Sequence, residues 1–176
     1  MPEKADEERR WLSELSRGDV EALGAVYDAY ARQLYAYARS LGSSEASAED
    51  ILQEVFLRLL RRAPKCSRIK SLAAYLFAMT RREFYRWGRR LLRRREIEPH
   101  DSAALFECAA QNSSVELVES LEEAISRLPR FQREVVMMKV FGGLTFEEIA
   151  EVMETSVNTA ASRYRYAKEK LKKVLS

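Results

Sequence analysis

The sequence predicts an all-α protein made of two helical lobes joined by a flexible linker. Apolar residues recur at helical spacing along most of the chain, and no stretch shows the strict alternation of a half-buried strand. Six glycines and four prolines in 176 residues leave long periodic segments uninterrupted. The periodicity is lost between Glu96 and Ser114, around Pro99. We therefore expect one domain over residues 1–95, a linker over 96–114 and a second domain over 115–176.

Four helices are expected in the N-terminal lobe, each with a start or stop signal. Gly18 can end the first helix, and Asp19 can cap the second. Gly42 breaks the second helix, Pro64 stops the third, and a short basic loop then runs to Lys70. The expected spans are Glu8–Arg17, Val20–Leu41, Ala48–Arg62 and Leu72–Arg94. The core-facing stripe expected for the second helix is Leu23, Val26, Tyr27, Tyr30, Leu34, Tyr37 and Leu41.

The C-terminal lobe contains a helix-turn-helix pattern. Two helices are expected first, over Val115–Leu128 and Arg130–Phe141, with Gly142 and Gly143 as a stop. Thr145 and Glu148 then have the spacing of a capping box, flanked by Leu144 and Ile149 at the positions of a hydrophobic staple. After a turn over 154–156, a last helix starts near Val157.

The last helix has two opposed faces. The side expected to be buried consists of Val157, Ala160, Ala161, Tyr164, Ala167 and Leu171. The opposite side consists of Asn158, Thr159, Ser162, Tyr166 and Lys173, flanked by Arg163 and Arg165. A hydrogen-bonding and basic face suits a helix in the major groove of DNA. A helical hairpin with a solvated basic face is the alternative interpretation.

Composition and charge exclude several classes of protein. Net charge is only +3, and no apolar run approaches the roughly 18 residues of a membrane helix. The charged start of the chain does not resemble a signal peptide, so we expect a cytoplasmic protein without a membrane partner. Cys66, Cys108 and the single His100 have no metal-ligand spacing, so no metal and no cofactor are expected. No nucleophile–base pair or phosphate-binding loop is evident, which argues against an enzyme.

The third helix carries an acidic outer face with one leucine in it. Ile51, Leu52, Val55, Phe56 and Leu59 form its core side. Asp50, Gln53, Glu54 and Arg61 form its outer side, with Leu57 among them. A large apolar residue on a polar face indicates a protein interface, and the carboxylates suit a basic partner. Alternatively, a capping box from Ser47 to Asp50 makes Asp50 structural, and the other residues are simply solvated.

The fourth helix is strongly basic. Residues 81–95 contain eight arginines and one glutamate. Phe77, Phe84, Trp87 and Leu91 fall on one side of this helix, and Arg82, Arg86, Arg89 and Arg93 fall on the other. Stacked arginines repel one another, and DNA phosphates would neutralise them. Binding to a membrane surface is the rival interpretation, although the aromatic side suits a protein core.

These motifs together resemble bacterial RNA polymerase sigma factors of the extracytoplasmic-function type. Leu128-Pro129, Gln132-Arg133-Glu134-Val135, Glu148-Ile149-Ala150-Glu151-Val152, Thr159 and Ser162-Arg163 follow the pattern of sigma region 4, which reads the promoter −35 element. The resemblance implies −35 contacts from Asn158, Thr159, Ser162, Arg163, Arg165 and Tyr166. Glu154 departs from the family's frequent glycine, and Tyr166 from a basic residue.

Residues 48–56, Ala-Glu-Asp-Ile-Leu-Gln-Glu-Val-Phe, resemble sigma region 2.2. In the family, that helix docks on the β′ clamp helices of core RNA polymerase, which implies polymerase contacts from Asp50, Gln53, Glu54 and Leu57. The following loop and helix melt and read the −10 element, where a base is flipped into a pocket. The implied −10 residues are Lys65, Ser67, Arg68, Lys70, Tyr75, Arg82, Arg86 and Arg89. The family usually has tryptophan at Tyr75, asparagine near Arg82 and aspartate near Arg86.

Three functions are therefore considered. The first is a sigma factor that recruits core polymerase to promoter DNA and whose lobes, free in solution, either pack together or are held by an anti-sigma factor. The second is a sigma-like interaction module that binds an anti-sigma factor or polymerase without opening promoters. The third is a plain helix-turn-helix regulator that binds duplex DNA without polymerase.

Overall fold

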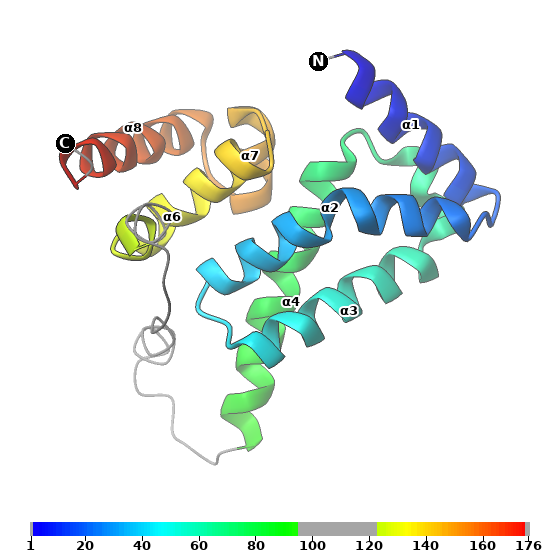
Figure 1. The fold of residues 1–176 in the computed structure, drawn as a ribbon, viewed down its shortest axis with the longest axis horizontal. Helices are drawn as coiled ribbons and strands as arrows, with labels where there is room; N and C mark the ends of the chain where they lie inside the picture. The colour runs from blue at the N-terminus through cyan, green and yellow to red at the C-terminus, as the bar shows by residue number, and fades with distance from the viewer. Residues whose placement is uncertain (1, 95–122, 175–176) are drawn as a thin grey trace.

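The computed structural model describes residues 2–94 and 123–174, and all regular structure in these residues is helical (Figure 1). The expected linker over 96–114, with a short helical turn near Ala103, and residues 115–122 of the next helix lie outside the described residues. No helix in the described ranges is long and apolar enough to span a membrane. The prediction of an all-α fold with two lobes is confirmed.

The N-terminal lobe is a bundle of four α-helices. Its elements are α1 (Pro2–Ser16), α2 (Glu21–Ser40), α3 (Glu45–Arg61), the short 3-10 helix η1 (Ala63–Arg68) and α4 (Leu72–Arg94). Helices α2, α3 and α4 pack against one another, and α1 covers α2 and η1. The core contains Val26, Tyr30, Leu34, Val55, Leu59, Leu72, Leu76, Phe77 and Phe84, all fully buried.

Two helix boundaries differ from the expected ones. Helix α1 extends over Pro2–Ser16 and so includes the residues before the expected start near Glu8. Helix α3 begins at Glu45 because Ser44 is its N-cap: the Ser44 hydroxyl accepts a hydrogen bond from the Ser47 amide at 3.2 Å. The proposed capping box from Ser47 to Asp50 is therefore wrong, and Asp50 lies inside the helix.

The C-terminal lobe contains the expected helix-turn-helix. Its elements are α6 (Arg130–Val136), the π-helix η3 (Met137–Phe141), α7 (Phe146–Met153) and α8 (Val157–Val174). The Thr145 hydroxyl accepts from the Glu148 amide at 3.2 Å, and the Glu148 carboxylate accepts from the Thr145 amide at 2.8 Å. This is the predicted capping box. Glu154 ends α7 in the left-handed conformation, with φ 54° and ψ 49°.

The two lobes pack together in this structure. Helix α7 lies between α8 and the N-terminal lobe, and it contacts α4 (Figure 1). Helix α2 contacts both α6 and η3. Gly142 lies at this boundary, because a Cβ added there would lie 2.8 Å from Cε2 of Phe77 in the N-terminal lobe and 2.7 Å from the Met138 carbonyl in its own lobe. Only glycine fits this position without displacement.

A buried carboxylate lies at the boundary between the lobes. Glu134 of α6 is 1% exposed and accepts from Arg81 Nε of α4 at 2.8 Å. The hydroxyls of Tyr37 and Tyr85 also point to it, at 3.3 and 3.4 Å, and Arg130 Nε lies 3.3 Å away. Beside it, Arg133 Nη1 donates to the Ser40 carbonyl at 3.0 Å. Burial, with Glu134 beside it, raises the pKa of Tyr37 well above its ordinary value.

Candidate nucleic-acid and protein interfaces

The outer face of α3 forms an exposed ridge made of Asp50, Gln53, Glu54 and Leu57, which we call the α3 ridge. Asp50 and Gln53 are exposed, and Leu57 is 41% exposed in spite of its apolar side chain. Glu54 is held on the ridge by Arg58 Nε at 2.7 Å and lies 3.7 Å from Arg61. The ridge therefore combines carboxylates with an apolar centre, as the sequence predicted.

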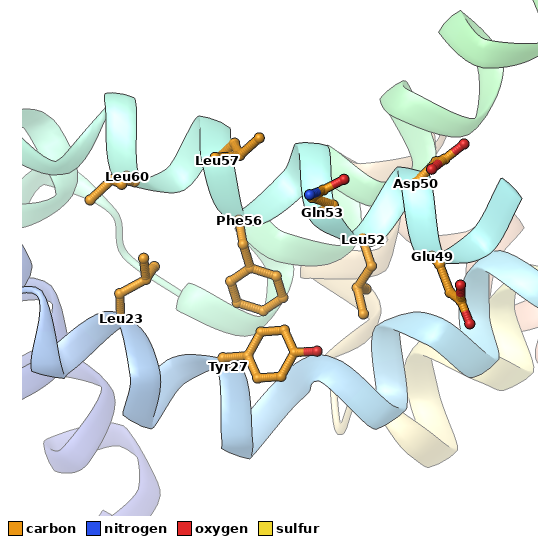
Figure 2. Close-up of a pocket in the computed structure, with 9 residues that line it drawn as sticks. All are labelled: Leu23, Tyr27, Glu49, Asp50, Leu52, Gln53, Phe56, Leu57 and Leu60. Carbon is orange, nitrogen blue, oxygen red and sulfur yellow. The ribbon is translucent and has the colours of Figure 1, made fainter. Parts of the chain in front are cut away.

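A hollow lies on each side of the α3 ridge. The first, of about 460 Å³, lies between α2 and α3 (Figure 2). Its lining is mostly apolar: Leu23, Tyr27, Glu49, Asp50, Leu52, Gln53, Phe56, Leu57 and Leu60. The second, of about 320 Å³, lies toward α4 and is lined by Asp50, Ile51, Gln53, Glu54, Leu57, Glu83, Trp87 and Arg90.

One residue of the first hollow lies in a different environment from the predicted one. Tyr27 was expected on the buried stripe of the second helix, but it is 49% exposed. Leu23, on the same stripe, is half-buried and packs against the core. The ring of Tyr27 packs on that of Phe56, with centroids 4.8 Å apart (Figure 2).

The basic segment before α4 is exposed. Lys65, Ser67, Arg68 and Lys70 all expose their side chains, three of them on η1. Tyr75 is half-buried one turn into α4, whose first turn is started by the Ser71 hydroxyl accepting from the Ala74 amide at 3.3 Å. Cys66 turns inward, and burial raises the pKa of its thiol. Loop and helix thus place these five residues within or just before the first turn of α4, whereas Arg82, Arg86 and Arg89 lie further along the helix.

The arginines of α4 fall into two groups. Arg82 and Arg89 are exposed, as expected. Arg86 instead donates to Glu83 at 2.5 Å. The side chain of Glu83 is 5% exposed and also pairs with Arg58 at 3.0 Å and Arg90 at 3.9 Å. The predicted repulsion is therefore relieved at Arg86 by a buried carboxylate, and the side chain of Arg93 lies outside the described residues.

Helix α8 presents a polar face away from α7. Asn158, Arg165 and Tyr166 are exposed, whereas Thr159, Ser162 and Arg163 are half-buried. Thr159 helps to start the helix, since its amide donates to the Ser156 hydroxyl at 3.1 Å. Val157, expected on the buried side, is 39% exposed because it is the first residue after the turn. Ala160 and Ala167 are buried as predicted.

One aromatic residue of this face was missed by the sequence. The Arg163 guanidinium lies over the ring of Phe131 from α6, 4.7 Å from its centroid, and Phe131 is 47% exposed. A cation over an aromatic ring is attracted by the ring quadrupole. Phe131 therefore limits the positions that Arg163 adopts. Arg165 lies in the same way over Tyr166, at 5.2 Å.

Both lobes match models of one protein family. Residues 26–95 match Sigma-70 region 2, and residues 118–171 match Sigma-70, region 4. The ECF RNA polymerase sigma factor EcfG of Rhodopseudomonas palustris is 32% identical over 145 residues, which cover 81% of this chain and 78% of the relative.

Solved structures have the same fold. The sigma factor RpoE from Bartonella quintana, crystallised with the anti-sigma factor NepR, is 27% identical with a TM-score of 0.61, over 81% of this chain and 89% of that one. CnrH, solved with the cytosolic domain of CnrY, has a TM-score of 0.68 at 22% identity, over 96% of this chain and 97% of that one.

Proposed function

Because the chain belongs to the extracytoplasmic-function group of sigma-70 RNA polymerase sigma factors, we propose that its α3 ridge docks on core polymerase and that α4 and α8 contact promoter DNA. Promoter-directed initiation of transcription is the function of this family. We assign residues 1–95 to polymerase docking and the −10 element, residues 96–114 to the linker and residues 115–176 to the −35 element. The protein acts in the cytoplasm, by binding rather than by catalysis.

The observation that carries this proposal is the α3 ridge with a hollow on each side. An exposed leucine beside an apolar groove suits the apolar face of a partner helix. Glu49, Asp50 and Glu54 border the two hollows and complement basic residues on such a helix. In the sigma factor family, the partner that fits this description is the β′ clamp helices of core polymerase.

The proposed DNA contacts differ between the lobes. In the N-terminal lobe, exposed cations of η1 and α4 lie where they can meet the backbone of an unwound strand, and half-buried Tyr75 offers a ring for a base to stack on. In the C-terminal lobe, the exposed face of α8 suits the major groove, where Arg163 and Asn158 can hydrogen-bond to base edges. Arg86 contributes less than Arg82 and Arg89, because its guanidinium is already paired with Glu83 within the lobe.

The packed lobes cannot reach both promoter elements at once. The −35 and −10 elements are about 25 base pairs apart, which is about 85 Å of duplex at a rise of 3.4 Å. A compact chain of this length has a radius of gyration of roughly 16 Å. The lobes must therefore separate on the promoter, and the contacts around Glu134 must break.

An anti-sigma factor is a second proposed partner. RpoE from Bartonella quintana, to which this chain is similar, was crystallised with the anti-sigma factor NepR. We propose that such a protein binds this chain in its closed form and competes with core polymerase. The sigma-like module that never opens promoters rests on Arg82 and Arg86, and of these Arg86 is already paired with Glu83 within the lobe.

Substitutions on the α3 ridge test the docking proposal. We expect Asp50→Asn and Leu57→Ala each to weaken binding to core polymerase several-fold, as interface residues of this kind do. Glu45→Gln is the matched control, because Glu45 lies on the same helix with its side chain 79% exposed and away from both hollows. Equal core binding by all three variants would place the docking surface elsewhere.

A further inference from the structure

Helix α1 lies before the residues that match the region 2 family model, yet it packs on the segment that carries the proposed −10 residues. The family match begins at residue 26. Trp11, Leu12 and Leu15 of α1 are buried, and the helix contacts η1 as well as α2. The helix is thus a fixed neighbour of the loop before α4 (Figure 1).

One carboxylate of α1 links three helices. Glu8 is half-buried, and its Oε2 accepts a hydrogen bond from the Leu72 amide at 3.2 Å. Its Oε1 accepts from the hydroxyl of Tyr30, a fully buried residue of α2. Because Leu72 is the first residue of α4, Glu8 ties the start of that helix to α1 and α2.

The hydrogen bond from the Leu72 amide to Glu8 gives a partner to a backbone donor at the start of α4. The first amides of a helix have no partner inside the helix, and a negative charge near them is favourable. Ser71 satisfies the Ala74 amide, and Glu8 satisfies the Leu72 amide. Lys70 and Tyr75, both proposed to meet the −10 element, lie on either side of this junction within one turn. A shift of the junction would move both.

We propose that Glu8 is a positioning residue for −10 recognition: it fixes the start of α4, and so fixes where Lys70 and Tyr75 meet an unstacked base. The proposal rests on the assignment of the −10 element to η1 and α4. It gives α1 a role in promoter reading, although α1 itself lies outside the matched domain.

The test is promoter discrimination by polymerase reconstituted with the full chain. A promoter mapped with the wild-type protein is compared with the same promoter carrying single base changes in its −10 element, and the ratio of open-complex formation is measured. We expect Glu8→Ala to reduce this ratio by about fivefold. The loss of one helix N-terminal cap typically changes the equilibrium constant for forming that helix end by about this factor. Glu7→Ala, an exposed neighbour on α1, is the control and should leave the ratio unchanged.

Two further variants separate positioning from folding. Glu8→Gln keeps an oxygen that accepts from the Leu72 amide and should retain most of the discrimination, whereas the shorter Glu8→Asp should lose it. Core binding should stay within about twofold in all variants, because the α3 ridge is distant in sequence and is not contacted by Glu8.

The outcomes distinguish this proposal from the one on which it rests. If Glu8→Ala and Glu8→Asp lower thermal stability but keep the wild-type discrimination ratio, Glu8 is only structural and the inference is wrong. If the wild-type protein itself does not discriminate between −10 sequences, the assignment of the −10 element fails, and this inference fails with it.

Discussion

Arg81 of α4 donates to Glu134 of α6 at 2.8 Å across the boundary between the two lobes. The carboxylate is 1% exposed and the arginine 17% exposed, so solvent screens this ion pair little. This ion pair thus links two residues that lie 53 positions apart in the chain, at a site that is largely shielded from solvent. The pair stabilises the closed form of the protein, and it is absent from any form whose lobes have separated.

Glu134→Gln should destabilise the closed form. Removing the charge leaves the half-buried Arg81 and Arg130 without their buried carboxylate, and breaking such a pair typically costs about 3 kcal/mol. Denaturant unfolding should detect the loss, and small-angle scattering should report a larger radius of gyration. Glu123→Gln removes the partner of Arg127 in a pair that is 60% and 67% exposed, and it should change stability by less than about 1 kcal/mol. A compact Glu134→Gln variant with unchanged stability would contradict the role of the pair.

The sequence was sufficient for the elements that local chemistry determines. The capping box at Thr145 and Glu148 depends on two side chains three residues apart, and it is present as predicted. Helix α4 begins at the predicted residue, Leu72, because the Ser71 hydroxyl caps its first turn. The core side of α3, from Ile51 to Leu59, was also correct because it follows helical periodicity.

What the sequence missed depends on contacts between distant residues. Glu134 belongs to a recognised motif, but its partners Tyr37, Arg81 and Tyr85 come from other helices. Tyr27 was placed in the core because a helical wheel shows which face is apolar and not how much of that face its neighbours cover. Glu83 lies within an arginine-rich run, and only the packing of α3 on α4 brings Arg58 to it.

The arginines of α4 should differ in their share of DNA binding. Arg82 and Arg89 are exposed, whereas Arg86 is bound to buried Glu83. Each phosphate contact adds about 0.7 to 0.9 to the slope of log affinity against log salt. In polymerase–promoter binding, we expect Arg82→Ala and Arg89→Ala each to reduce the magnitude of that slope by nearly the amount that one phosphate contact contributes. Arg86→Ala should reduce it by less. Equal reductions in the slope from all three variants would show that the pairing with Glu83 does not limit the contact of Arg86 with phosphate.

Phe131→Ala should weaken binding to the −35 element without changing the fold. The ring lies 4.7 Å below the Arg163 guanidinium, and an exposed contact of this kind is worth about 0.5 to 1 kcal/mol, a two- to fivefold effect on affinity. Holoenzyme affinity for promoters that differ at the −35 element measures the effect. Val140→Ala, on the adjoining η3 and 58% exposed, is the control. If both variants bind equally well, Phe131 does not position Arg163.

Glu154→Gly should stabilise the C-terminal lobe. Glu154 has φ 54°, and the left-handed conformation costs a residue with a Cβ about 1 kcal/mol relative to glycine. Thermal unfolding should therefore shift upward by a few degrees, about the change that 1 kcal/mol produces in a protein of this size. Glu151→Gly, an exposed position inside α7, should shift it downward. If Glu154→Gly leaves the unfolding temperature unchanged or lowers it, the turn is not strained.

Transcription in vitro from genomic fragments, with core polymerase and this protein, tests the central claim most directly. We predict start sites that are preceded by one shared −10 element and one shared −35 element, and that disappear when the protein is omitted. Tight binding to core polymerase without promoter-specific transcripts would contradict this and would instead identify an interaction module that does not open promoters.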